Sequence, residues 1–493
     1  MESADPPVAA PAWERWTLYA LAAVAAVSGL AARLWLQRDL PLWVDESWTV
    51  MVATQPDWAG VWNEAWRDAN APLYYLLMAL WTPLAGVSDA ALRLPSLIFA
   101  VLAGLLPLLW RAPGLSFSAR LAWGTMLWLW VGGLGFSADA RVYALLLLLA
   151  TAQAIAFVRL LDSPERRDAL VWAIFATLAG LAHYFALFLT LAQGVLLLMA
   201  IGPRRALRLW PAGLAFLPLA FWLAIHLPRL LEFARADVGW YVRLDAGTSL
   251  ALTQYLAGPW TWPFLLLVAL LLGAVLMLRG QRIEESGTKP LLVAALAGLI
   301  AFALVLILGW LRPSVTARYL TPFVPAVLLG LVLMARHARR AGLAYAALVV
   351  LYLLPLATLP AIRAGLRERN AYSLEPASDW LAPFRPGHVA FLWDHPNMSI
   401  VADESLQPVG GFFLARAGAP TAVTVVRVPP GGDVADALIV AAGQDQVGIL
   451  WFYDGAFRPD TAAATRRLAG DAAWRCRAFP REGGRGVLAC MAR

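Results

Sequence analysis

Long apolar stretches recur along most of this 493-residue chain and limit what it can fold into. A transmembrane helix needs about 20 mostly apolar residues. Hydrophobic residues make up 61% of the chain and charged residues only 14%, which is more apolar surface than a soluble fold of this length can bury. We therefore predict a polytopic α-helical membrane protein. Its eleven predicted spans lie near residues 17–36, 91–110, 119–136, 142–160, 169–182, 184–201, 207–227, 261–278, 291–311, 319–335 and 342–361.

The topology depends on residues 72–87, an apolar stretch that is short and contains Pro83. If this stretch lies at the membrane surface, five short basic loops share one side, as is typical of cytoplasmic loops. These loops contain Arg111, Arg159, Arg204, Arg279 and Arg336. We therefore predict a cytoplasmic N-terminus, with residues 37–90 forming an extracytoplasmic loop that carries juxtamembrane helices.

The tail has a different pattern, with short apolar runs typical of buried strands. Strands are predicted at residues 388–393, 422–427 and 447–452, and a helix is predicted at residues 433–442. The sequence thus predicts a transmembrane module followed by a small extracytoplasmic α/β domain. The predicted boundaries are residues 1–365 for the module and 375–493 for the domain.

The chain's two cysteines, Cys476 and Cys490, both lie in the tail. Strand-like runs at residues 474–479 and 487–491 flank a turn near Gly483, so a hairpin would place the cysteines opposite each other. Such a pair would oxidise outside the cytoplasm. Two unrelated thiols are the alternative.

Polar residues gather at the helix ends on the predicted extracytoplasmic side. Asp45 and Glu46 follow the first span between Trp43 and Trp48. Ionisable residues at the membrane are costly and usually functional. Because consecutive spans alternate in direction, further polar residues return to the same depth. These are Asp139, Arg141, Tyr143, His183, Tyr184, Arg318 and Tyr319.

A carboxylate, arginines and a histidine at one membrane face suit sugar transfer from a polyprenyl-phosphate donor. Arginine and histidine can hold the phosphate and stabilise it as it leaves. The carboxylate can take the proton from an acceptor hydroxyl, and a single displacement inverts the anomeric centre. A transporter or flippase of lipid-linked saccharides is the alternative. It would carry polar residues at mid-membrane and two related halves, whereas the spans here are mostly leucine, alanine and valine.

In order and spacing, several motifs resemble the GT-C superfamily of membrane glycosyltransferases. The resemblance is to the family 39 group of protein O-mannosyltransferases and aminoarabinose transferases, and it covers about residues 40–335. Ala71 stands where the family usually has a second proline, and Asp139 where it often has glutamate. The matching pieces are Asp45-Glu46, Pro72-Leu73-Tyr74-Tyr75, Leu92-Arg93-Leu94-Pro95-Ser96, Asp139-Ala140-Arg141-Val142-Tyr143, His183-Tyr184-Phe185 and Ala317-Arg318-Tyr319-Leu320.

The resemblance implies roles for individual residues. Asp45 is expected to be the catalytic base and Glu46 to orient or shape the site. The expected donor phosphate and sugar site contains Asp139, Arg141, Tyr143, His183, Tyr184, Arg318 and Tyr319. Most of this group acts without a catalytic metal, so we expect no cofactor. Related oligosaccharyltransferases use a divalent ion, which leaves Asp45, Glu46 and Asp139 as alternative ligands for Mg or Mn.

Each of these residues also has a structural alternative. Asp45 and Glu46 suit the dipole at the start of a helix, and the two arginines could reach lipid headgroups. His183 could be a structural histidine, and Asp139 could simply pair with an arginine. The expected location is the bacterial cytoplasmic (inner) membrane, and nothing in the sequence indicates nucleic-acid binding. The sugar, the lipid carrier and the acceptor (lipid, glycan or protein) stay open.

Overall fold

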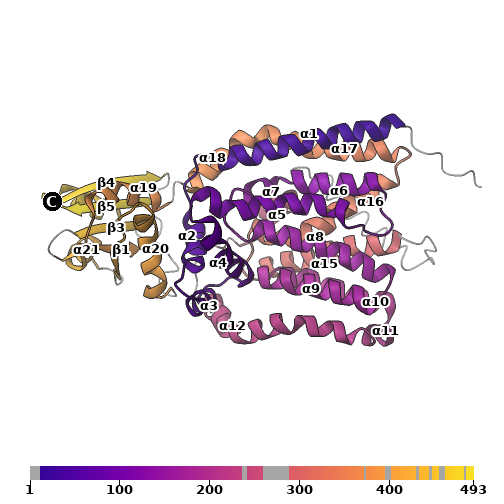
Figure 1. The fold of residues 1–493 in the computed structure, drawn as a ribbon, viewed down its shortest axis with the longest axis horizontal. Helices are drawn as coiled ribbons and strands as arrows, with labels where there is room; N and C mark the ends of the chain where they lie inside the picture. The colour runs from indigo at the N-terminus through magenta and orange to yellow at the C-terminus, as the bar shows by residue number, and fades with distance from the viewer. Residues whose placement is uncertain are drawn as a thin grey trace, which may run out of the picture. The chain divides into compact units, whose positions relative to one another are not determined.

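The structure is a computed structural model that describes residues 12–235, 241, 243–258, 288–370, 373–394, 401–428, 432–443, 447–454, 461–481 and 485–493. The predicted span near residues 261–278 lies outside them. The chain divides into two compact units, each made of several segments (Figure 1). The sequence-based division near residue 370 stays a prediction. Unit 1 comprises Met1–Leu36, Arg93–Ile225 and Trp240–Leu359, and unit 2 comprises Gln37–Leu92, His226–Gly239 and Pro360–Arg493.

Unit 1 is built of helices that run alongside one another (Figure 1). Within the described residues, seven helical segments of the chain are long and apolar enough to cross a membrane, so the predicted polytopic α-helical class is confirmed. Apart from α18, which is given with the tail below, the elements that lie in unit 1 or begin or end in it are α1 (Ala12–Gln37), α5 (Asp89–Leu109), α6 (Phe117–Leu129), α7 (Val131–Phe136), α8 (Tyr143–Asp162), α9 (Arg166–Ala182), α10 (Ala186–Ile201), α11 (Pro203–Leu207), η1 (Trp210–Phe216), α12 (Leu217–Arg235), α13 (Ala246–Ala257), α15 (Thr288–Leu311), η2 (Ala317–Phe323), α16 (Val324–Arg336), α17 (Ala341–Leu353) and η3 (Leu354–Thr358).

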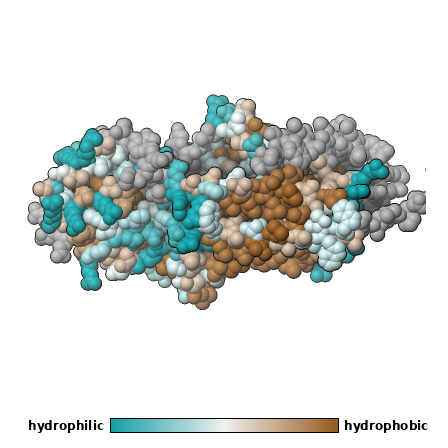
Figure 2. All heavy atoms as spheres, turned by 90° about the horizontal axis from the view of Figure 1, so that it is seen from above, coloured by the Kyte–Doolittle hydropathy of each residue, from teal (hydrophilic) through white to brown (hydrophobic). Residues whose placement is uncertain are grey.

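Helix α8 lies at the centre of unit 1. It packs against α9, α15, α16 and η2. In its most apolar window 83% of the residues are buried, against 28% in α1. A helix that is apolar all round is expected to be buried on all sides. Outer helices instead expose apolar side chains such as Met199 and Leu311, and Figure 2 shows such apolar surface gathered over the helical unit. This surface suits contact with lipid.

Two predicted spans are interrupted where the sequence is poor in helix formers. Residues 119–136 break at Trp130, between α6 and α7, and the break precedes three glycines that are weak helix formers. The Trp130 indole N–H donates to the Tyr255 carbonyl at 2.7 Å. Residues 319–335 begin as the 3₁₀ segment η2, which contains Pro322, before α16 starts. Both interruptions lie next to the site described below.

Unit 2 contains the first loop and the tail. The loop forms the helices α2 (Val44–Ala53), α3 (Trp58–Arg67) and α4 (Leu73–Ala85). Helix α4 has 13 residues and is therefore about 20 Å long, too short for a hydrocarbon core of about 30 Å. It packs against α2 and α3, as expected for a juxtamembrane helix.

The tail is a mixed sheet with helices on its faces, so the predicted α/β class is confirmed. Its strand order is β2-β1-β3-β5-β4, with β1 parallel to β2 and β3, and β5 antiparallel to β3 and β4. The strands are β1 (His388–Trp393), β2 (Ala422–Val425), β3 (Val447–Asp454), β4 (Trp474–Arg481) and β5 (Arg485–Ala492). The helices are α18 (Leu359–Asn370), α19 (Glu375–Leu381), η4 (Ala382–Phe384), α20 (Asp403–Arg416), α21 (Val434–Ala442) and α22 (Thr461–Gly470).

The two cysteines lie in the predicted hairpin. Cys476 on β4 pairs with Cys490 on β5 in the strand register, and their sulfur atoms are bonded at 2.02 Å. The disulfide therefore joins the edge strand β4 to its neighbour.

Candidate functional site

Three turns of unit 1 bring the predicted donor-site residues together. One leads from α7 into α8, one joins α9 to α10, and the third is η2. Helices α8 and α10 both pack against η2, so the three turns lie at the same end of the bundle. They carry Asp139, Arg141, Tyr143, His183, Tyr184, Arg318 and Tyr319.

Aromatic rings form the centre of this cluster. The His183 ring lies 4.8 Å from that of Tyr319 and 5.9 Å from that of Tyr143, centroid to centroid. Phe185 adds a fourth ring, 4.7 Å from Tyr319. The guanidinium carbon of Arg318 lies 5.6 Å from the Tyr143 ring and 6.0 Å from the Tyr319 ring. The rings help to place the guanidinium, and a guanidinium can bind an anionic phosphate through charge-assisted hydrogen bonds.

Several charged or polar members of the cluster are buried. Asp139 is 2% exposed, and Arg141 and His183 are each 6% exposed. Arg318 is half-buried. Side chains that reach lipid headgroups keep their charged ends in a polar environment, so the burial of Arg141 fits an internal site better than an interfacial contact.

His183 lies in the turn between α9 and α10 and is neutral. Burial lowers the pKa of His183 to about 3, with further lowering from the nearby charges of Arg318 and Arg141. Its Nδ1 accepts a hydrogen bond from the Phe185 amide at 3.3 Å. The neutral ring therefore carries its proton on Nε2, where it can donate a hydrogen bond.

Tyr184 has a structural partner. Its hydroxyl accepts a hydrogen bond from the Trp222 indole N–H at 2.8 Å, which ties the α9–α10 turn to α12. The role predicted for Tyr184 in donor binding stays a prediction.

Some residues of the cluster did not stand out in the sequence as site residues. The Tyr241 and Tyr319 hydroxyls are 3.1 Å apart, and the Thr321 hydroxyl donates to the Arg318 carbonyl at 2.7 Å. In the sequence, Tyr241 beside Trp240 suggests an aromatic anchor at the interface, with packing against a sugar face as the alternative. Nothing in the sequence connects it with Tyr319.

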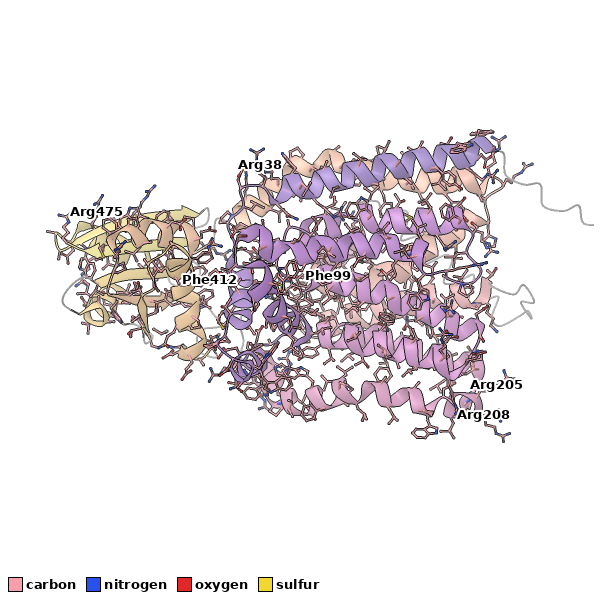
Figure 3. All side chains as sticks on the ribbon, viewed as in Figure 1. Arg38, Phe99, Arg205, Arg208, Phe412 and Arg475 are labelled. Atoms are coloured by element: carbon pink, nitrogen blue, oxygen red, sulfur yellow. A yellow bond between two sulfur atoms is a disulfide. The ribbon has the colours of Figure 1, made fainter. Side chains whose placement is uncertain are left out.

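One of the predicted cytoplasmic loops, the one that follows α10, lies away from the cluster. Arg205 and Arg208 follow the C-terminal end of α10 and are exposed (Figure 3), whereas His183 precedes its N-terminal end. Helix α10 has 16 residues, so about 24 Å of helix separates the two sets. The site and the loop that carries Arg205 and Arg208 are therefore at opposite ends of α10, as the predicted topology requires for this loop.

The two predicted catalytic carboxylates belong to unit 2 and occupy the first turn of α2. Asp45 is half-buried. Glu46 is fully buried, and its carboxylate accepts a hydrogen bond from the Trp43 backbone N–H at 3.0 Å. Its own N–H donates to the Trp43 carbonyl at 2.9 Å. Glu46 thus caps the N-terminal end of α2, and Asp45 is the more accessible carboxylate of the pair.

A divalent metal ion is the alternative that the sequence leaves open. Among the described residues, no group of three or more His, Cys, Asp or Glu side chains is placed to hold a metal ion. The alternative of a Mg or Mn site at Asp45, Glu46 and Asp139 therefore stays a prediction.

Comparisons with known proteins identify the fold. No family model matches the chain, and no curated protein matches its sequence. In structure it is similar to ArnT from Cupriavidus metallidurans in the apo state, with a TM-score of 0.59 and 13% sequence identity over 95% of this chain and 97% of ArnT.

Two further solved structures are similar. ArnT from Cupriavidus metallidurans bound to undecaprenyl phosphate matches with a TM-score of 0.54, 13% identity and the same coverage of both chains, 95% and 97%. Arabinosyltransferase EmbB from Mycobacterium smegmatis matches 74% of this chain and 32% of its own length, with a TM-score of 0.39 and 19% identity. The chain has the fold of ArnT, so the predicted fold class is confirmed.

Proposed function

We propose that this protein is an inverting glycosyltransferase that moves a sugar from a polyprenyl-phosphate donor to an acceptor at the extracytoplasmic face of a bacterial cytoplasmic membrane. The observation that carries the proposal is the cluster of Arg141, His183 and Arg318 at one end of the helical unit. The ArnT fold supports it, because one solved ArnT structure is bound to undecaprenyl phosphate.

In this proposal the cluster binds the donor. Arg141 and Arg318 supply charged donors for the phosphate, and neutral His183 supplies a hydrogen bond from Nε2. Charge-assisted hydrogen bonds of this kind stabilise the anion that forms when the glycosidic bond breaks. The rings of Tyr143 and Tyr319 lie next to the His183 ring.

Asp45 is the proposed catalytic base. It takes the proton of an acceptor hydroxyl while that oxygen forms a bond to the anomeric carbon of the sugar. The bond from this carbon to the phosphate oxygen breaks, and its electron pair leaves with the polyprenyl phosphate. One displacement inverts the anomeric centre. Glu46 has a positioning role, since its carboxylate is engaged at the start of α2.

The donor can be identified in cells. Mass spectrometry of lipid-linked sugars in a deletion strain should find one polyprenyl-phosphate sugar accumulating, because its consumer is missing. The wild-type gene supplied in trans should return that lipid to its normal level. An unchanged set of lipid-linked sugars in the deletion strain would contradict the proposal.

A further inference from the structure

The segment that leads into α2 is held by side chains from the start of the tail. Residues 38–43 connect α1 to α2. The Asn370 side-chain amide donates to the Pro41 carbonyl at 2.7 Å. The Arg363 guanidinium donates to the Arg38 carbonyl at 3.1 Å. Both donors belong to α18, and all these residues are in unit 2.

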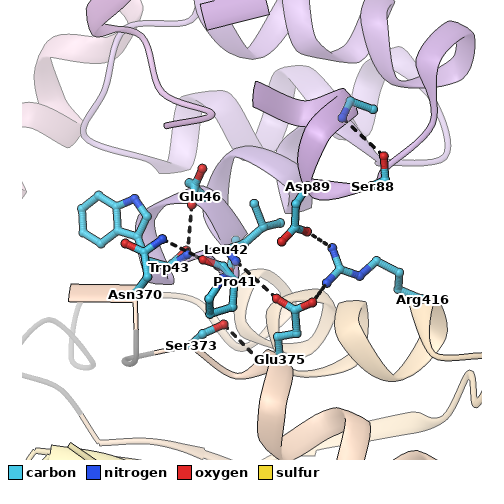
Figure 4. A network of polar contacts seen from close by, with 12 residues as sticks. Pro41, Leu42, Trp43, Glu46, Ser88, Asp89, Asn370, Ser373, Glu375 and Arg416 are labelled. Carbon is cyan, nitrogen blue, oxygen red and sulfur yellow. Dashed lines mark hydrogen bonds and ion pairs between the residues drawn. The ribbon is translucent and has the colours of Figure 1, made fainter. Parts of the chain in front are cut away.

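The next two residues of the segment are also held from the tail. The backbone N–H of Leu42 donates to the Glu375 carboxylate at 3.3 Å (Figure 4). The guanidinium carbon of Arg369 lies 4.2 Å from the centre of the Trp43 ring. The segment is thus fixed through its backbone as well as through an aromatic side chain, immediately before Val44 begins the helix.

Glu375 is itself held by a charge network. Arg416 on α20 forms ion pairs with both Glu375 and Asp89, the second at 2.5 Å (Figure 4). Burial and the neighbouring Asp89 carboxylate raise the pKa of Glu375, and Arg416 opposes them. Arg416 on the tail helix α20 therefore holds in place the Glu375 carboxylate that accepts the hydrogen bond from Leu42.

These contacts are expected to be rigid because most of their polar atoms are withdrawn from water. Asn370 is 0% exposed, and the side chain of Glu375 is 19% exposed. A buried donor or acceptor that loses its partner costs about 1–3 kcal/mol. The bonds to Pro41 and Leu42 thus restrict where α2 can begin.

We propose that Asn370 and Glu375 are positioning residues for the carboxylate of Asp45, so that the tail sets the geometry of the catalytic step. This inference rests on the proposed function, in which Asp45 is the base. Asp45 lies three residues beyond Leu42, in the first turn of α2. Misplacing a catalytic group by about 1 Å can lower a rate about a hundredfold, so loss of these backbone contacts acts on turnover.

The test compares Asn370→Ala, Glu375→Ala and Glu375→Gln in the full-length protein. Glutamine keeps an oxygen that can accept the Leu42 N–H, whereas alanine does not. Arg467→Ala is the matched control, because Arg467 forms its ion pairs with Asp433 and Asp436 at another place in the same tail. Three quantities are measured: kcat for sugar transfer, Kd for the lipid donor, and hydrogen exchange of the amides of residues 43–47.

The two alanine variants should lose at least tenfold in kcat, keep the donor Kd within about twofold, and exchange the amides of residues 43–47 faster. Glu375→Gln should recover most of the lost turnover, and Arg467→Ala should behave as wild type. Unchanged kcat and exchange in both alanine variants would overturn the proposal, as would equal losses with glutamine and alanine. A wild-type protein that transfers no sugar would instead refute the proposed function, and the exchange data would still decide whether the contacts position α2.

Discussion

The residues of the proposed donor site in unit 1 differ in charge and in exposure. Arg318 is half-buried and close to two aromatic rings, whereas Arg141 and His183 are almost fully enclosed. A neutral His183 near two cations avoids a third positive charge in a buried site, where charges are hard to accommodate. The more accessible Arg318 is therefore the side chain best placed to meet an incoming phosphate.

Replacing Arg318 by alanine should weaken binding of the lipid donor at least tenfold. A hydrogen bond to a charged group contributes about 1.5–3 kcal/mol, and 1.4 kcal/mol is a factor of ten. Donor affinity is measured by titration of the purified protein, with Arg205→Ala as the control, because Arg205 is exposed near the other end of α10. An unchanged Kd in Arg318→Ala would remove this residue from the donor site.

At the scale of elements, the helices of unit 1 approach one another through small residues. An added Cβ at Gly124 on α6 would lie 2.3 Å from the backbone oxygen of Gly104 on α5, so the two helices come together backbone to backbone. Gly194 on α10 has nothing within 4 Å of the same position. One glycine is therefore required by packing and the other is not.

Gly124→Ala should destabilise the protein by about 1–3 kcal/mol, because the added methyl group meets backbone that cannot move aside. Gly194→Ala should be neutral or stabilising by up to about 1 kcal/mol, since alanine is the better helix former. Thermal unfolding of the two variants in the same detergent measures the difference. Equal unfolding temperatures would show that the backbones of α5 and α6 are farther apart at Gly124 than in this structure.

Elements with a regular pattern could be predicted from the sequence, and those defined by tertiary contacts could not. The alternation around Gly483 gave the register that pairs Cys476 with Cys490. The break at Trp130 follows from weak helix formers and a bond to Tyr255, which hydropathy does not detect. Likewise, Asp45 and Glu46 are adjacent in sequence, but only the fold shows that Glu46 caps a helix and that Asp45 is the more accessible of the two.

At the scale of the whole molecule, the proposed reaction requires Asp45 and the donor site to face the same side of the membrane. The loop charges predict that residues near Asp45 and Arg318 face the extracytoplasmic side and that Arg205 faces the cytoplasm. This prediction rests on the uneven distribution of lysine and arginine among the loops. The sequence could not reveal that residues 37–92 share a compact unit with the tail, because that follows from contacts between distant segments.

Single cysteines at exposed positions test this topology. In a background with both native cysteines changed to serine, Arg38→Cys and Arg312→Cys should react with a membrane-impermeant thiol reagent applied to spheroplasts. Arg205→Cys should react only after the membrane is permeabilised. If positions 38 and 312 were labelled from opposite sides of the membrane, the proposed base and the donor site would also lie on opposite sides. That result would contradict the proposed reaction.

The most direct test of the central claim is sugar transfer by purified Asp45→Asn protein, supplied with the donor identified in the deletion strain. Removing a general base lowers a rate by about 10²–10⁴-fold. The account predicts a loss of turnover in that range with donor affinity and thermal stability preserved, because asparagine keeps the shape of the side chain but cannot take the proton. Turnover equal to that of the wild type would show that Asp45 is not the base and that this assignment of the reaction is wrong.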